Sequence, residues 1–480
     1  MASSATDLTQ QAVSFIEAVR YEDLSPEALR LGRRCILDAV GLYLAGSQEH
    51  SVRILIEDAL DQGGRADAPL PAGGRAKVPA AIAARVWGTA GHAHDWDDTQ
   101  VSNDPAHVYG LLTHPTIPPL TAALVMSERL GEKDGRRLML AFQAGFEVEC
   151  KISEWMKPRH YRRGHHSSGT VGTFGACVAA AKLLGLTGER LAHALGVAAS
   201  FAAGIRANFG TMTKPLHVGR ACENGVTAAL LAFRGFDADP SVLDGQWGFF
   251  SVMGEGLDID KTTQGFGRRM TIEDPGVSIK PYPSGILTHQ SMDAMLKLVL
   301  DHDLKFDEVA RIRFFAGANI IEPIRYPIAR NHLQAKFSMP ALLAMLILRR
   351  RASHHEFDDA FVAGTDMQDL QARTEVINDP DIDAKGYDLI RSRIEVETKD
   401  GRKLVQWADE RYRGGPLNPI SDADLEAKFR MCAEGVVDRA TEDEILQLAR
   451  AFDSCADVRR LVSLIASGGA SQPQMKAVAG

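Results

Sequence analysis

The chain has 480 residues, of which 45% are hydrophobic, and its formal net charge is −8. One hydrophobic core seldom serves a chain of this length, so we expect two domains. The negative charge offers no general attraction to nucleic acid or to an anionic membrane, so neither is an expected partner, and any anion must be bound by a local group of cations.

No stretch of about eighteen uncharged apolar residues is present, and the first residues, MASSATDLTQQ, lack the features of a signal peptide. We therefore expect a cytoplasmic protein. The six cysteines are scattered along the chain and form no C-x-x-C pair, which argues against structural zinc and against a disulfide framework.

The first half of the chain has the pattern of helices. The clearest case runs from Pro26 to Ser47, where apolar residues recur at helical spacing and Ser25 followed by Pro26 marks a helix start. Stretches rich in Gly and Ala between residues 170 and 235 predict helices that pack backbone to backbone. Residues 1–270 are therefore expected to form the N-terminal part of a large all-helical domain.

The pattern changes near Thr271. Segments 308–317 and 392–408 alternate apolar and polar residues, and Lys399 to Arg402 form a strong hairpin signal, so we expect strands there. Helical patterns at 291–303 and 339–351 lie between them. Residues 271–411 are thus predicted to form a smaller α/β domain.

After Tyr412 the helical pattern returns, and residues 412–480 are expected to rejoin the first domain. The predicted fold class is mostly α, with a large all-helical domain built from N- and C-terminal segments and a smaller α/β lid domain inserted between them. A cleft between two such domains is a common place for a ligand.

The densest polar segment runs from Gly91 to Thr116 and contains His92, His94, Asp95, Asp97, Asp98, Thr99, His107 and His114. Its spacing fits no recognised metal-ligand pattern, so we expect no metal. Aspartates beside histidines suit acid–base chemistry better, because they orient one another and shift pKa values. Asp95 and His114 are the preferred candidates, whereas Asp97 and Asp98 fit equally well as capping residues at a helix end.

A second cluster, KPRHYRRGHHSSGTVGTFG, places basic residues directly before a Gly-rich helix start. Cations next to exposed backbone N–H groups favour an anion such as a carboxylate. Neither a phosphate-binding loop nor a strand-led G-x-G-x-x-G is present, so we expect no nucleotide. Most of these basic residues fit a solvated loop, and His166 is the one chosen as a candidate.

Three later segments add single candidates. Lys214 directly precedes Pro215, which disfavours helix for the residue before it and so predicts an extended Lys214 at a helix boundary. Residues 279–294 are rich in Pro and Gly at the junction between the patterns and offer Lys280 and His289. Tyr326 could donate a proton or a hydrogen bond to a developing anion.

Together these motifs resemble the MmgE/PrpD family, which includes a 2-methylcitrate dehydratase, a cis-aconitate decarboxylase and an iminodisuccinate epimerase. The resemblance rests on HDWDDT with a following THP, GHHSSGTVGTFGA, TKPLHVGRA, KPYPSG and AKFSMP, in that order. It implies a helical large domain, an α/β lid, a homodimer, and no required metal or organic cofactor. The chain lacks the GHPSDNLG-type stretch of 2-methylcitrate dehydratases, so the substrate stays open.

The resemblance also implies roles for single residues. Asp95, His114, His166, Lys214 and Tyr326 match family positions that we assign to catalysis, and Thr99 and His289 match positions that we assign to substrate binding. Lys280 is added as a substrate-binding candidate from its place in the junction segment alone. The segment between Thr99 and His114 is long, so His107 competes with His114 for the role of the first-motif histidine.

The predicted function is a cofactor-independent lyase that removes a proton next to a carboxylate of a small polycarboxylate and then eliminates, as a dehydratase does. Asp95 or His166 would be the base, and His114 or Tyr326 the acid. An epimerase or isomerase of a dicarboxylate, or a decarboxylase acting on cis-aconitate, is the alternative. A non-catalytic binder of small molecules and a metal-dependent hydrolase are weaker alternatives.

Overall fold

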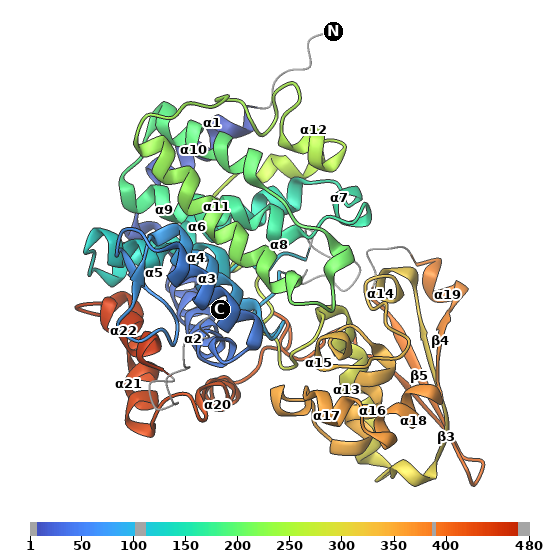
Figure 1. Ribbon diagram of the computed structural model, residues 1–480. Helices are drawn as coiled ribbons and strands as arrows, with labels where there is room; N and C mark the ends of the chain where they lie inside the picture. Colours follow the sequence, from blue (N-terminus) through green and yellow to red (C-terminus); the bar gives the residue numbers. More distant parts are fainter. Residues whose placement is uncertain (1–6, 101–111, 386–389, 469–480) are drawn as a thin grey trace.

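The computed structural model describes residues 7–100, 112–385 and 390–468, and its elements form a larger helical part and a smaller α/β part (Figure 1). The prediction of a mostly α protein is confirmed. Each part has its own hydrophobic core. The first core draws on residues 8–279 and 420–465, and the second on Phe209 and residues 282–412.

The helical part contains two groups of helices and one short hairpin. The N-terminal group is α1 (Leu8–Ala18), α2 (Pro26–Ser47), α3 (His50–Gln62), α4 (Ala80–His92), α5 (Ile117–Leu130), α6 (Gly135–Trp155), α7 (Arg159–Arg162), α8 (Ser167–Thr170), α9 (Gly172–Leu184), α10 (Gly188–Phe201), α11 (Thr213–Phe233) and α12 (Phe249–Gly254). The C-terminal group is α20 (Asp422–Ala433), α21 (Arg439–Arg450) and α22 (Arg459–Ser467). The hairpin pairs β1 (Ala68–Pro69) with β2 (Lys77–Val78).

Helix α2 begins and ends where the sequence predicts. The Ser25 hydroxyl accepts a hydrogen bond from the Ala28 N–H at 2.9 Å, and Pro26 occupies the first helical position, where its missing N–H costs nothing. The helix is buried from Cys35 to Ser47 and packs against α4 on one side and α20 on another. The C-terminal group therefore lies against the N-terminal group, as the red and blue helices of Figure 1 show.

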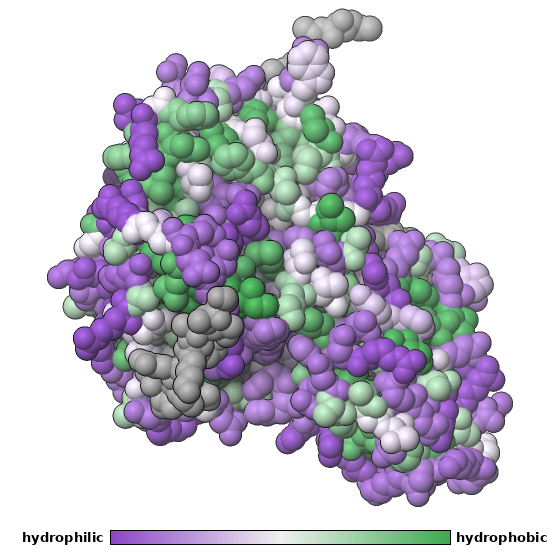
Figure 2. All heavy atoms as spheres, viewed as in Figure 1, coloured by the Kyte–Doolittle hydropathy of each residue, from purple (hydrophilic) through white to green (hydrophobic). Residues whose placement is uncertain are grey.

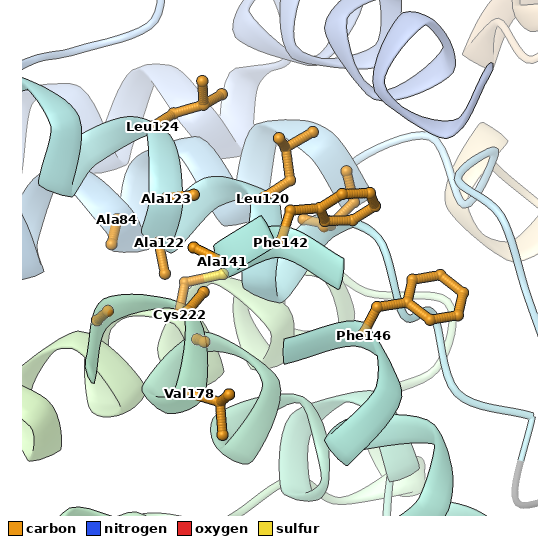
Figure 3. Packing of buried hydrophobic residues seen from close by; sticks show 14 of the residues in the cluster. Ala84, Leu120, Ala122, Ala123, Leu124, Ala141, Phe142, Phe146, Val178 and Cys222 are labelled. Carbon is orange, nitrogen blue, oxygen red and sulfur yellow. The ribbon is translucent and has the colours of Figure 1, made fainter. Parts of the chain in front are cut away.

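Small side chains let the central helices α4, α5, α6, α9 and α11 approach closely. Figure 3 shows this packing, with alanines of α4, α5 and α6 beside Val178 of α9 and Cys222 of α11. The helices α4 and α11 meet most tightly where Gly219 faces α4. A Cβ atom at Gly219 would stand 2.1 Å from the Thr89 Oγ1 and 2.4 Å from the Arg85 carbonyl oxygen. The backbone of α4 therefore excludes any side chain there.

Substitution Gly219→Ala is accordingly expected to destabilise the protein by about 3 kcal/mol, the upper end for overpacking, because a carbonyl oxygen cannot move aside without shifting its helix. The free energy of unfolding, measured with denaturant, checks this. Gly185→Ala serves as the comparison, since a Cβ at Gly185 meets nothing within 4 Å and the cost there comes from its positive φ of 68° alone. An effect of Gly219→Ala below that of Gly185→Ala would contradict the packing argument.

The α/β part consists of a four-stranded sheet with helices on one face (Figure 1). The strand order is β4-β3-β5-β6, with β3 parallel to β4 and antiparallel to β5. The elements are β3 (Val309–Ala316), β4 (Thr374–Asn378), β5 (Ser392–Thr398) and β6 (Lys403–Trp407), with α13 (His289–Asp301), α14 (Ala318–Ile321), α15 (His332–Ala335), α16 (Met339–Arg349), α17 (Asp359–Val362), α18 (Thr365–Ala372) and α19 (Pro380–Asp383).

The predicted strands at 308–317 and 392–408 are confirmed, as are the turn between β5 and β6 and the helices α13 and α16. Strand β4 was not predicted. The domain boundaries at residues 270 and 411, and the role of the α/β part as a lid, stay predictions. Among the described residues, no helix is both long and apolar enough to cross a membrane.

Candidate active site

A cavity lies where the two parts meet. The helical part contributes Asp95, His114, His166 and Lys214, and the α/β side contributes Lys280. Five of the predicted site residues therefore come together in one place, from segments as far apart as 185 positions in sequence. All five are buried, with at most 6% of each residue exposed. Figure 2, by contrast, shows hydrophilic residues spread over the outer face of both parts.

Asp95 is the centre of the cavity's charge. It follows the end of α4 and has a φ of 53°, a left-handed conformation that is unusual for a residue with a side chain. Its Oδ1 accepts hydrogen bonds from the ammonium groups of Lys280 and Lys214, each at 2.9 Å. Its Oδ2 is buried and has no hydrogen-bond partner among the described residues. One carboxylate oxygen thus holds two cations together.

Lys280 is fully buried and uses all of its donors. Its ammonium group donates to the Asp95 carbonyl oxygen at 3.0 Å and to the Ser284 carbonyl oxygen at 3.2 Å, in addition to the Asp95 carboxylate. An ammonium group has three N–H donors, so none remains for a ligand. Lys280 therefore fixes Asp95 and adds positive charge to the cavity.

Lys214 connects the cavity to a buried histidine. Its ammonium group lies 2.8 Å from the His92 Nε2, and because ammonium can only donate, this nitrogen accepts. The proton of the His92 ring then sits on Nδ1, which donates to the Asp97 carboxylate at 2.8 and 2.9 Å. The rings of Phe209 and Phe337 flank the Lys214 ammonium, at 5.4 and 5.3 Å. One Lys214 donor remains beyond its described partners, Asp95 and His92.

His114 presents an imidazole nitrogen between two carboxylates. Its Nδ1 lies 3.2 Å from Asp97 Oδ2 and so carries the proton, while its Nε2 lies 3.7 Å from Asp95 Oδ1. The backbone N–H of His114 donates to the Ser168 hydroxyl at 3.0 Å, which fixes the residue against α8. The Nε2 lone pair is therefore available to take up a proton, and the resulting cation would lie beside both carboxylates.

His166 stands at the N-terminal end of α8. Its Nδ1 is 3.0 Å from the Nδ1 of His217, so one of the two rings donates and the other accepts. Its ring packs edge-on against Phe209, with the centroids 5.0 Å apart. His166 thus joins the cavity wall with a neutral imidazole.

Burial and the lysines set the protonation states. Burial lowers the pKa of His92 to about 3, lowers that of His114, and lowers that of His166 well below its usual value. Burial alone would raise the pKa of Asp95, but the ammonium groups of Lys214 and Lys280 hold it well below the ordinary value. Burial also lowers the pKa of Lys214. At neutral pH the histidines are neutral and Asp95 is charged.

Four of these side chains have the geometry of a possible metal site. The ligand atoms of His92, Asp95, Asp97 and His114 all lie within 4.8 Å of one another. The donor chemistry fits a metal poorly, however, because the Lys214 ammonium already occupies the His92 Nε2 and the Asp95 Oδ1 also holds Lys280. A divalent cation would face two ammonium groups. This arrangement favours the prediction that the site binds no metal, and that prediction stays untested.

Three predicted site residues do not line the cavity. Thr99 is buried, and its hydroxyl lies 3.5 Å from the Nδ1 of the lining residue His114. His289 is buried beside Tyr282, and its Nε2 lies 3.2 Å from the Ser284 carbonyl oxygen. Tyr326 donates its hydroxyl hydrogen to the Phe209 carbonyl oxygen at 2.7 Å. His107, the competitor of His114, lies outside the described residues.

Two local expectations need correction. Lys214 is helical and not extended, because α11 begins at Thr213 and a proline is tolerated in the first turn of a helix. The basic loop before α8 does not converge on the cavity as an anion site. Arg159 and Arg163 are exposed and pair with Glu255 on the surface. Tyr161 and His166 are the residues of that segment that line the cavity.

Sequence reasoning missed three residues that support the site. His92 and Asp97 lie in the polar segment that drew attention, but nothing in their spacing separated them from capping residues. Lys428 of α20 is 6% exposed and carries no motif. Its ammonium group donates to the Trp96 and Lys280 carbonyl oxygens at 2.8 and 3.0 Å and pairs with Asp38 of α2 at 2.6 Å. It ties the two segments that carry Asp95 and Lys280.

Comparison with known proteins finds relatives that are named cis-aconitate decarboxylases. The chain is 26% identical over 477 residues to the cis-aconitate decarboxylase of Homo sapiens. That alignment covers 98% of this chain and 96% of the human protein. It is 25% identical over 466 residues to the protein of the same name from Mus musculus, covering 95% and 93%. A cis-aconitate decarboxylase from Aspergillus terreus (strain NIH 2624 / FGSC A1156) is 26% identical over 378 residues, covering 72% and 74%.

Family models cover most of the chain. The MmgE/PrpD N-terminal domain matches residues 10–262, which is more than half of the chain, and the MmgE/PrpD C-terminal domain matches residues 282–454. The first match contains Asp95, His114, His166 and Lys214. The second begins two residues after Lys280 and continues through the α/β part to just beyond the end of α21. The two matches follow one another along the chain, and the first alone covers more than half of it. The chain therefore belongs to the MmgE/PrpD family.

Proposed function

We propose that the protein is a lyase that acts on a small polycarboxylate by proton transfer at a carbon next to a carboxylate, without a metal or organic cofactor. One observation carries the proposal: a neutral histidine, His114, and a buried ammonium with a remaining donor, Lys214, share one cavity with a charged aspartate. This pairs a base with a cation that can stabilise the anion formed. The three relatives described above are named cis-aconitate decarboxylases, which agrees with lyase chemistry.

In the proposed reaction Lys214 donates its remaining N–H to a substrate carboxylate. A hydrogen next to a carboxylate is weakly acidic, and the ammonium lowers the barrier by stabilising the negative charge that develops on that carboxylate. Burial of Lys214 strengthens this interaction, because the surrounding protein screens charge less than bulk water does. The tie to His92 and Asp97 holds the ammonium in position.

His114 is proposed as the base, in place of the Asp95 or His166 expected from sequence. Its Nε2 has a lone pair, and the imidazolium that forms is stabilised by Asp95 and Asp97. Asp95 is a weak base, since its pKa lies well below the ordinary value. In a dehydration, the electrons of the broken C–H bond form the double bond, and the C–O bond to the hydroxyl breaks. The bound substrate anion raises the pKa of His166, so that His166 becomes protonated and supplies a proton to the leaving hydroxyl.

Decarboxylation is the second candidate, and the relatives favour it. There a proton is added to one alkene carbon, and the electrons of the breaking C–CO₂ bond replace the double bond one position along. The same residues would serve, with His114 as acid after proton uptake. The homodimer and the cytoplasmic location stay predictions.

The test is an assay of the purified protein on hydroxy acids such as citrate and 2-methylcitrate, on cis-aconitate and on succinate derivatives, in deuterated water. Alkene absorbance reports dehydration, released carbon dioxide reports decarboxylation, and deuterium in recovered substrate reports proton transfer alone. Absence of all three signals across the panel, with intact binding of the acids, would reject the proposed lyase.

Exhaustive dialysis against EDTA is expected to leave turnover within about twofold of the untreated enzyme, because ammonium groups supply the positive charge that a metal supplies elsewhere. Turnover before and after dialysis checks this, with added Mg²⁺ and Zn²⁺ as separate arms. A loss of turnover that a divalent ion restores would assign His92, Asp95, Asp97 and His114 to a metal.

A further inference from the structure

Three buried lysines hold the turn that carries Asp95. The carbonyl oxygens of three consecutive residues, His94, Asp95 and Trp96, each accept a hydrogen bond from a different ammonium group. The donors are, in that order, Lys336 at 3.0 Å, Lys280 at 3.0 Å and Lys428 at 2.8 Å. All three lysines are buried, with at most 6% of each residue exposed. Because buried carbonyl groups need partners and charged donors bind them strongly, the turn is fixed at three successive points.

Two of these lysines fix the peptide planes on either side of the Asp95 Cα atom. The His94 carbonyl, bound by Lys336, belongs to the plane before this atom, and the Asp95 carbonyl, bound by Lys280, belongs to the plane after it. A peptide unit is rigid, so the orientations of the two planes set the φ and ψ of Asp95. The φ of 53° is unfavourable for a residue with a side chain, and such a conformation persists only where surrounding contacts impose it.

Lys336 reaches this turn from the α/β part. It directly follows α15 and lies 242 positions after His94 in sequence. Its ammonium group packs 4.6 Å from the centre of the Phe357 ring, and the next residue, Phe337, lines the cavity. Lys336 itself does not line the cavity. It therefore connects the α/β part to the Asp95 turn without contacting a ligand.

The Lys336 side chain is a charged donor at neutral pH. Burial lowers its pKa to about 8, and the carboxylates of Glu49 and Asp95 oppose that effect. A charged donor binds a carbonyl oxygen more strongly than a neutral one. The contact with the His94 carbonyl can therefore impose an orientation on the peptide plane.

We propose that Lys336 is a positioning residue, which through the His94 carbonyl aims the Asp95 carboxylate at Lys214 and His114. The inference rests on the proposed function for the roles of Lys214 and His114. Without the Lys336 donor, the peptide plane before Asp95 loses its anchor. The 2.9 Å contact of Asp95 Oδ1 with the Lys214 ammonium and its 3.7 Å approach to the His114 Nε2 then lose their alignment.

Lys336→Met tests this role, because methionine keeps a buried apolar chain of similar length and removes the donor. The value of kcat should fall about 10- to 100-fold, since a displacement of about 1 Å in a catalytic group is enough for such a loss. KM should change less than about threefold, because Lys214 keeps its contact with His92 and can still bind the substrate. Lys336→Arg keeps a cationic donor and should be at least about threefold faster than Lys336→Met.

Hydrogen–deuterium exchange, measured by mass spectrometry, follows the turn without any need for turnover. In Lys336→Met the amides of residues 93–100 should exchange about tenfold faster than in the wild type, because a hydrogen bond that closes the turn is lost. Peptides from the central helices α5, α6 and α9 should keep their wild-type protection. A contact that served only general stability would instead raise exchange in those helices as well.

Lys182 of α9 offers a matched control. Its half-buried ammonium group donates to the carbonyl oxygens of Ile16 and Val19, where α1 ends, and Lys182 does not line the cavity. Lys182→Met therefore removes the same kind of hydrogen bond away from the Asp95 turn. It should leave kcat and the exchange of residues 93–100 unchanged. If it lowers kcat as far as Lys336→Met does, the loss reports general loosening and the inference is overturned.

The outcomes separate the inference from the proposed function. Faster exchange confined to residues 93–100 in Lys336→Met, with no turnover of any acid by the wild type, keeps Lys336 as the anchor of the turn and rejects the lyase. Unchanged exchange there overturns the inference, and so does a kcat equal to that of the wild type, which leaves the lyase standing. A folded Lys336→Arg protein that is no faster than Lys336→Met overturns it too. If a thermal melt shows Lys336→Met to be unfolded, Lys336→Gln takes its place in each comparison.

Discussion

Replacing Lys214 by alanine is expected to lower kcat/KM on the true substrate about a hundred- to a thousandfold, the usual effect of removing one preorganised group that stabilises the transition state. The ammonium touches Asp95 and His92 and holds one donor in reserve for the substrate. Lys214→Arg should restore activity only in part, because a planar fork cannot take the place of a compact ammonium between two aromatic rings.

Stability must be measured in parallel, since Lys214 is buried. Its removal leaves Asp95 with Lys280 as its described cationic partner and leaves the His92 Nε2 without a donor. We expect a loss of about 1–3 kcal/mol in the free energy of unfolding, the range for a buried polar group left unpaired. Lys297→Ala, at an exposed lysine of α13, is the control and should change neither quantity. A folded Lys214→Ala protein with near wild-type activity would reject the proposed carboxylate site.

His114→Gln is expected to lower kcat about a hundred- to ten-thousandfold, because glutamine keeps a hydrogen bond but cannot accept a proton from carbon at neutral pH. Wild-type pH dependence gives an independent check. Burial lowers the pKa of His114 from its usual 6.5, so the neutral base persists into acid, and kcat/KM should begin to fall only below pH 6.5.

The variant Asp97→Asn sharpens this assignment. Asp97 raises the pKa of His114 and opposes the effect of burial, so its neutralisation should move the acid limb of kcat/KM to lower pH still. Deuterium exchange into substrate should disappear in His114→Gln if His114 removes the proton. If exchange in His114→Gln continues at the wild-type rate, His114 is not the base, and His166 is the remaining candidate.

The large helices could be predicted because the local signals agree with the tertiary structure. At α2, the Ser25 cap, Pro26 and a long apolar stripe all specify the same helix. Strand β4 gave no such signal, because it is a short edge strand whose residues are half-buried or exposed, and its partner β3 lies far away in sequence. A pattern of alternating burial is absent there.

The sequence could predict which segments contribute residues to the site, but not which side chains contact one another. Residue types pointed to Asp95, His114, His166, Lys214 and Lys280, yet nothing in the sequence says that Lys214 donates to His92 or that Tyr326 turns to Phe209. Such facts depend on how helices pack. Lys428 illustrates the limit, since an ordinary helical lysine bonds to a carbonyl oxygen 332 positions earlier.

The hydrogen bonds of Lys428 have a consequence for the order in which the protein is made. Synthesis runs from the N-terminus, so α4 and the Asp95 segment leave the ribosome long before α20. Until residue 428 has emerged, the carbonyl oxygens of Trp96 and Lys280 lack their common donor, and Asp38 of α2 lacks its ion pair with Lys428. A growing chain can therefore bury most of its helical core while its cavity is still unfinished, and translation that stops before α20 leaves a protein with every cavity-lining residue but without the lysine that aligns them.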